Sequence, residues 1–202
     1  MNADRDETAR AVRDIHDPDT RRAALTRAYR LAGPDDYRLS PEWLSDPMVF
    51  AMAEDNESHA GAHNVTKLAR ACDQYPETRW FAAAVFSGEV SDLVEVPDPP
   101  RALGWADEDG ARVRAIGAIY AGRSFILFSL DRPAAILYSV HEYSLITGSR
   151  QFVEAYFGDL DRAAEDLDEF WDDAYAIWGS NPAHAAEFEK RRAVVREQIR
   201  LW

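Results

Sequence analysis

The sequence predicts an α+β fold, in which an antiparallel β-meander of about four to five strands packs against N-terminal and C-terminal α-helices. Residues 1–75 carry helix caps and apolar residues at three- and four-residue spacing. Residues 79–147 carry short apolar runs between turn residues, and residues 149–202 return to helical spacing. With 202 residues, of which 47% are hydrophobic, the chain is long enough for one core, so we expect a single α+β domain over residues 1–202.

In the first part of the chain, helix starts are marked by a capping residue followed by proline or an acidic side chain. Ser40-Pro41-Glu42 has this pattern, and Asp46-Pro47 repeats its first two positions. Gly33-Pro34 ends the helix that precedes them. These signals predict helices from Asp19 or Thr20 to Leu31, around Trp43-Leu44, over Met48–Met52 and, after a break near Gly61, over Val65–Cys72.

The middle of the chain carries apolar runs of six to eight residues, separated by turns such as Asp109-Gly110 and Asp131-Arg132-Pro133. Because the connections between the later runs are short, we expect neighbouring strands to pair antiparallel. The predicted strands are Trp80–Phe86, Val113–Tyr120, Ser124–Leu130 and Ala135–Val140. Glycines then separate three C-terminal helices, which we expect over residues 149–157, 159–178 and 183–200.

The formal net charge of −13 is concentrated in two blocks of the chain. Residues 41–100 carry three basic and eleven acidic side chains, and residues 151–180 carry one and nine. Nucleic acids and anionic membranes bind to basic surface, so this balance argues against direct contact with either. It permits a basic protein partner, whose approach it would accelerate by electrostatic steering.

The chain also lacks the signals of secretion and membrane insertion. No run of about 18 apolar residues is present, and residues 1–14 are charged throughout. One cysteine, Cys72, allows no internal disulfide and fits a reducing compartment, so we expect a cytoplasmic protein. Cys72 lies in an alanine-rich helical run, which predicts a buried, unreactive thiol.

Residues 159–178 form the most acidic stretch, with eight carboxylates, four large aromatic side chains and one arginine. In a helix, the apolar residues recur every three or four positions and form a stripe that can face a core. The carboxylates then lie mostly on the opposite face, where like charges four residues apart repel one another. The carboxylates that we predict to bind a basic partner are Asp161, Glu165, Asp168, Glu169, Asp172 and Asp173.

Other uses of these carboxylates remain open. They can form a solvated outer face without a partner, or they can pair inside the fold with the basic side chains between Lys190 and Arg200. Metal chelation is disfavoured, because the stretch lacks the Asp-rich loop with its glycine that binds calcium. A second acidic patch, formed by Glu54, Asp55 and Glu57, is predicted to bind the same partner.

Two histidines near this patch were considered as metal ligands. His59 and His63 are four residues apart, so on a helix their rings share a face, as zinc-binding pairs do. Ala60 stands where the zinc proteases have glutamate, and Gly61 weakens the helix between the two rings. We therefore predict no metal and no other cofactor, and keep His59 and His63 as the candidates should a metal bind.

Candidates for catalysis are few. His141 and Glu142 follow an apolar strand and are the residues available for an acid–base pair. Adjacent strand residues point to opposite faces, however, so the two side chains do not readily meet. Phosphate loops, serine elbows and dinucleotide-binding glycine patterns are absent from the sequence. The sequence therefore favours a protein that is not an enzyme.

Charge and composition together predict a cytoplasmic, acidic protein that binds or inhibits a basic protein partner. An immunity protein, an antitoxin or a nucleic-acid-mimicking inhibitor has this character, and the mechanism would be occlusion of the partner's cationic surface. The alternative is a small enzyme, or a ligand- or metal-binding protein, with a site between the sheet and its helices. A third hypothesis is a homo-oligomer in which acidic and basic helices of different subunits meet.

Overall fold

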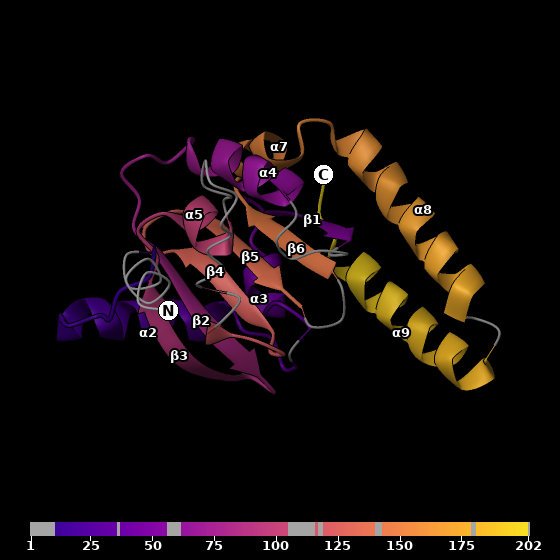
Figure 1. Cartoon of the computed structure of the whole chain (residues 1–202), viewed down its shortest axis with the longest axis horizontal. Coiled ribbons are helices and arrows are strands. Elements are labelled where there is room, and N and C mark those ends of the chain that lie inside the picture. Colours follow the sequence, from indigo (N-terminus) through magenta and orange to yellow (C-terminus); the bar gives the residue numbers. More distant parts are fainter. Residues whose placement is uncertain are drawn as a thin grey trace, which may run out of the picture.

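The computed structural model describes residues 11–35, 37–55, 62–104, 116, 119–139, 143–178 and 181–201 (Figure 1). In these residues, six strands form one antiparallel sheet in the order β1-β6-β5-β4-β2-β3. The strands are β1 (Phe50–Asp55), β2 (Trp80–Phe86), β3 (Glu89–Glu95), β4 (Phe125–Ser129), β5 (Ala134–Tyr138) and β6 (Tyr143–Gly148). The helices are α2 (Pro18–Leu31), α3 (Pro41–Leu44), α4 (Ala62–Cys72), α5 (Pro99–Gly104), α7 (Arg150–Phe157), α8 (Leu160–Trp178) and α9 (Pro182–Gln198). The α+β class is confirmed, with six strands rather than four to five.

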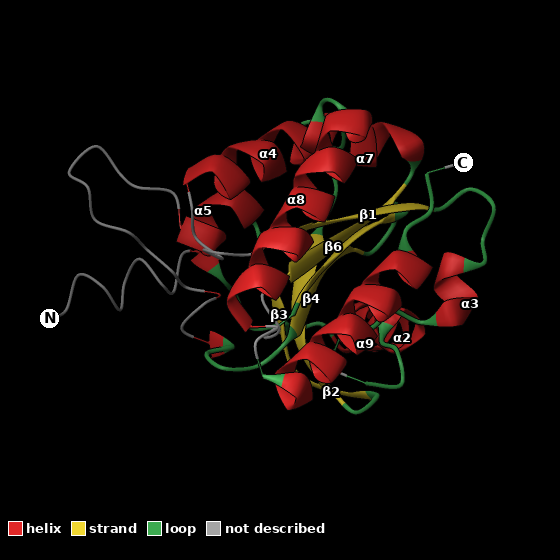
Figure 2. Cartoon of the chain, turned by 90° about the vertical axis from the view of Figure 1, so that its right-hand side faces the viewer, coloured by secondary structure: helices red, strands yellow, loops and turns green. Residues whose placement is uncertain are grey.

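Helices cover both faces of the sheet (Figure 2). On one face α7 packs on β6 and β1, with α4 beside it and α5 beside α4. On the other face α2 packs on β3 and β4, with α3 next to it. Because both faces are covered, every residue of β4, β5 and β6 is buried.

The two long C-terminal helices enclose the β1 edge of the sheet (Figure 1). α8 runs past β1, and α9 returns toward the side of the sheet that carries α2 and α3 (Figure 2). Trp171 of α8 packs against Phe188 of α9, with ring centroids 5.0 Å apart. Beyond α9, Arg200 and Ala51 exchange two backbone hydrogen bonds of 2.8 Å each. These bonds occupy part of the β1 edge, where free N–H and C=O groups would otherwise face another chain.

β1 takes the place of the helix that the sequence predicts over Met48–Met52, so that prediction is wrong. Asp46-Pro47 forms a turn instead, in which the Asp46 carboxylate accepts a hydrogen bond of 2.9 Å from the Met48 N–H. The same bond from a side chain to the backbone serves helix caps and turns alike, so the signal is ambiguous. β1 pairs with β6 along its whole length, and this pairing outweighs the helix preference of its Ala and Met residues.

The meander consists of β4, β5 and β6, and therefore lies one strand later than predicted. The predicted strand Val113–Tyr120 is wrong at its described residues, because Ile116 and Ile119 are helical and the Tyr120 N–H donates to the Ile116 carbonyl at 3.0 Å. The other predicted strands are confirmed to within one or two residues as β2, β4 and β5. The sequence does not predict β3, because β3 is a largely exposed edge strand without an apolar run.

The C-terminal helices form where their start and stop signals predict them. Ser149 caps α7, since its hydroxyl accepts a hydrogen bond of 3.2 Å from the Phe152 N–H. Gly158 ends α7 with a φ of +79°, a conformation that glycine adopts easily. Asp159 then caps α8, with its carboxylate 3.0 Å from the Arg162 N–H.

Candidate functional site

Two of the six α8 carboxylates predicted to bind a partner, Asp168 and Asp172, pair with α9. The Asp168 Oδ1 atom lies 2.7 Å from Nη2 of Arg196, and the Asp172 Oδ1 atom lies 2.9 Å from Nη2 of Arg192. The Arg192 side chain is only 15% exposed, so its charge is partly desolvated and held in place. These two carboxylates stabilise the packing of α9 on α8, and less of their charge is available to a partner.

The remaining α8 carboxylates are exposed to solvent, as Asp168 and Asp172 are, but none of them forms an ion pair with a described residue of α9. Arg162 is shared among three of them, at 3.3 Å from Glu165, 2.7 Å from Asp166 and 4.0 Å from Glu169. Asp161 and Asp173 form no ion pair with any other described residue. We call this surface the outer face of α8; it comprises Asp161, Arg162, Glu165, Asp166, Glu169 and Asp173.

Glu54, predicted to belong to a second partner-binding patch, is instead buried between β1, α4 and α7. Its Oε2 atom lies 2.6 Å from Nζ of Lys67, and its Oε1 atom accepts a hydrogen bond of 2.5 Å from the Tyr156 hydroxyl. Only 10% of the Glu54 side chain and 17% of the Lys67 side chain are exposed. The carboxylate is thus satisfied within the fold, which removes it from the partner-binding surface.

The phenols near Glu54 remain neutral. Burial, reinforced by the negative charge of Glu54, raises the pKa of Tyr156 well above its ordinary value. Burial and the same charge also raise the pKa of Tyr138, on the neighbouring part of the sheet. This cluster of one carboxylate, one ammonium and neutral phenols is a closed internal network, and its chemistry is structural.

The other candidate site residues from the sequence lie outside the described residues or have side chains that are not described. Glu57, His59, His141 and Glu142 lie outside the described residues, as do the side chains of Asp55 and His63. In the part of the chain that the structure describes, no group of three or more His, Cys, Asp or Glu side chains could hold a metal ion. The prediction that no metal binds, and the candidacy of His141 and Glu142 as an acid–base pair, therefore stay predictions.

Cys72 lies in the last turn of α4 and is partly buried. Burial, with smaller contributions from Asp73 and Asp98, raises the pKa of its thiol. Since only the thiolate reacts, we expect native protein at pH 8 to be alkylated by iodoacetamide more than about a hundredfold more slowly than unfolded protein. Mass spectrometry of quenched samples measures the two rates, and equal rates would contradict the burial of this thiol.

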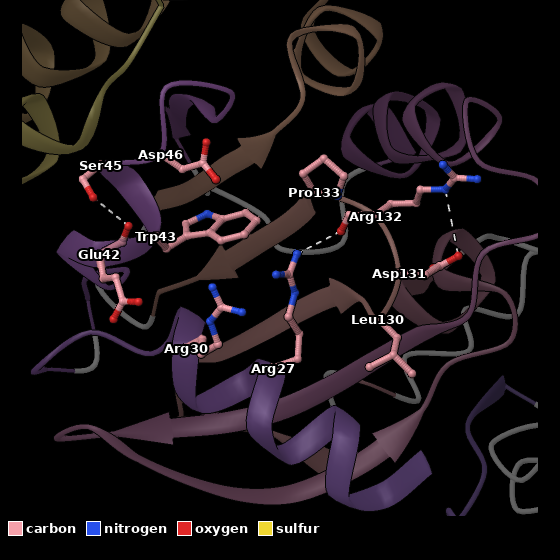
Figure 3. Close-up of a pocket in the computed structure, with 10 residues that line it drawn as sticks. All are labelled: Arg27, Arg30, Glu42, Trp43, Ser45, Asp46, Leu130, Asp131, Arg132 and Pro133. Carbon is pink, nitrogen blue, oxygen red and sulfur yellow. Dashed lines mark hydrogen bonds and ion pairs between the residues drawn. The ribbon is translucent and has the colours of Figure 1, made fainter. Parts of the chain in front are cut away.

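A cavity of about 470 Å³ opens between α2, α3 and the turn that joins β4 to β5 (Figure 3). Its wall includes Trp43, which is buried and whose indole N–H donates to the Thr147 hydroxyl at 3.1 Å. The Arg27 guanidinium lies 4.4 Å from the centroid of the Trp43 ring, and its Nη2 donates to the Arg132 carbonyl at 3.0 Å. Arg27 is therefore held rigidly by stacking and by one hydrogen bond.

A second arginine, Arg30, lines the same cavity one helical turn further along α2 (Figure 3). Neither arginine forms an ion pair with a described carboxylate, whereas Arg22 earlier in α2 pairs with Asp19 at 3.2 Å. Burial, and then the positive charge of Arg30, lower the pKa of Arg27. The pair is not among the predicted site residues, although the sequence carries one signal for it: no acidic residue stands three or four positions from either arginine.

Comparison of the chain with protein-family models, with curated protein sequences and with solved structures finds no match. Within the described residues, no helix has both the length and the apolar character needed to cross a membrane. Among the described residues, the outer face of α8 and the arginine-lined cavity each bring together charged side chains that lack ion-pair partners.

Proposed function

We propose that this protein is an acidic binding protein, which presents the outer face of α8 to a basic protein partner. One observation carries the proposal: the five exposed carboxylates of the outer face of α8 are accompanied by one cation, Arg162, which pairs with only three of them. The arginines of α9 that pair with α8 contact Asp168 and Asp172 instead. The folded chain therefore leaves this surface with a net charge of about −4 at neutral pH.

Rigidity supports the same role. α8 is 19 residues long, and its opposite face packs on β1 and α9, so the outer carboxylates are displayed on a fixed helix. A partner with arginines or lysines at matching spacing would form charge-assisted hydrogen bonds to this face without reordering its backbone. Binding would cover the partner's cationic surface. We therefore propose an inhibitory role, in the manner of an immunity protein, an antitoxin or a nucleic-acid mimic. The proposal includes a cytoplasmic location.

Capture of a partner from a cell lysate, with wild-type protein and a matched variant as baits, tests the proposal. The outer-face variant carries Asp161→Asn, Glu165→Gln, Glu169→Gln and Asp173→Asn, and none of these changes removes a contact with α9. We expect the wild-type protein to retain a basic protein at about 0.15 M salt and to release it near 1 M salt, where the Debye length falls to about 3 Å. We expect the variant to retain no such protein at either salt concentration. Equal retention by wild type and variant would contradict the proposal.

A further inference from the structure

We infer that the cavity between α2 and α3 is a binding site for a small molecule that carries one anionic group, a carboxylate or a phosphate, with Arg27 and Arg30 as the residues that recognise it. This site is independent of the proposed function, because it lies on the α2–α3 side of the sheet, whereas the outer face of α8 belongs to a helix that packs at the β1 edge.

The first argument is the imbalance of hydrogen bonds at Arg27. A guanidinium has five N–H donors, and the described structure supplies Arg27 with one acceptor, the Arg132 carbonyl. Its Nε atom is buried without a hydrogen-bond partner. That atom is closed off from solvent, so the groups available to a ligand are the terminal N–H donors, for which the described residues supply only the Arg132 carbonyl. A guanidinium with so few acceptors at the wall of a cavity can donate to an acceptor that binds there.

The second argument is electrostatic. Arg27 and Arg30 lie side by side in a chain of net charge −13, and neither is neutralised by a described carboxylate. Their mutual repulsion disfavours the empty site, and one oxyanion between them would remove it and would accept hydrogen bonds from both. Arg27 is already held against Trp43, so little conformational entropy is lost when the anion binds.

The acidic residues of the same wall restrict the ligand. Asp131 lies beside its neighbour Arg132 at 3.9 Å, and the Asp46 carboxylate accepts the Met48 N–H, while Glu42 lies exposed at the rim. These carboxylates would repel a polyanion such as a nucleic acid, and they can accept hydrogen bonds from hydroxyl or amino groups. The volume of about 470 Å³ falls in the range of small-molecule sites, so the site suits a small, singly anionic ligand with donors at its other end.

The test is an NMR titration of the whole chain with inorganic phosphate and, separately, with acetate, each against sodium chloride of equal ionic strength. We expect saturable shifts of the Trp43 indole N–H and of the Arg27 Nε–H, with a dissociation constant on the order of millimolar for fragments of four or five heavy atoms. A response to phosphate alone assigns a phosphoryl ligand, and a response to acetate alone assigns a carboxylate. If both anions produce saturable shifts, the ligand is assigned to the oxyanions as a class.

Two variants locate the effect. Arg30→Gln should weaken binding about tenfold or more, because an exposed charge-assisted contact is lost while the fold is untouched. Arg22→Gln is the matched control on the same helix, and it should bind like wild type. The absence of saturable shifts with either anion, shifts reproduced by chloride, or an unchanged dissociation constant for Arg30→Gln would each overturn the inference.

Discussion

Replacing Lys67 with methionine should destabilise the protein by about 3–5 kcal/mol, because Glu54 would keep its buried position and lose its cation. Methionine preserves most of the volume of the lysine stem, so the loss measures charge rather than packing. Chemical denaturation monitored by circular dichroism gives the free energy of unfolding of wild type and variant. The Tyr156 hydroxyl would remain as a donor to Glu54, but a neutral phenol does not offset a full charge.

The chain contains a matched control, since Lys190 is its other lysine and lies exposed on α9. Lys190→Met should change the free energy of unfolding by less than about 0.5 kcal/mol. A loss of under 1 kcal/mol in Lys67→Met, or a loss no larger than that in Lys190→Met, would contradict the buried ion pair.

Gly148→Ala should cost about 3–5 kcal/mol, which combines backbone strain with steric overlap. Gly148 has a φ of +151°, and an added Cβ would lie 2.0 Å from the Pro133 carbonyl oxygen. That oxygen also accepts the Ser149 N–H at 2.7 Å, so the backbone there is fixed from both sides. The clash falls at the end of β6, where Gly148 pairs with both β5 and β1, so this end of three strands would have to shift.

Gly122→Ala is the control for the glycine experiment. Gly122 also has a positive φ, +69°, but nothing lies within 4 Å of the added Cβ, so only the backbone term of about 1–2 kcal/mol should appear. Thermal unfolding of both variants measures the difference. If the two substitutions cost the same, the close approach of Gly148 to the Pro133 carbonyl would be contradicted.

The sequence predicts the helices better than the strands, and particular residues explain why. Ser149 and Gly158 act through bonds within a few positions, so the limits of α7 are encoded locally. β1 is the opposite case: its partner β6 lies about ninety residues later, and Ala-Met-Ala has no local preference for a strand. Ser87 and Gly88 form the hairpin turn between β2 and β3, and both have positive φ. A glycine in a turn is visible in the sequence, but β3 is exposed and has no apolar run, so the sequence does not predict the second strand of the hairpin.

The candidate site was predictable only in part, for the same physical reason. The carboxylates of α8 are visible in the sequence, and their pairing with the arginines of α9 was one of the open alternatives. Which of them pair depends on the packing of Trp171 on Phe188, which sets the rotation of one helix against the other. Glu54 looked like surface charge, because its partners Lys67 and Tyr156 stand 13 and 102 residues away in the sequence.

The division of the α8 carboxylates into those that pair with α9 and those of the outer face is most directly tested by titrating two variants with one basic probe, a synthetic arginine-rich peptide. The outer-face variant is called the external variant. The internal variant carries Asp168→Asn and Asp172→Asn, which remove the ion pairs with α9. We expect the external variant to bind the peptide at least about tenfold more weakly than wild type with an unchanged free energy of unfolding. The internal variant should keep most of the affinity and lose about 0.5–2 kcal/mol of stability. If instead both variants lost affinity equally, or if the internal variant lost more, the outer face of α8 would not be the binding surface.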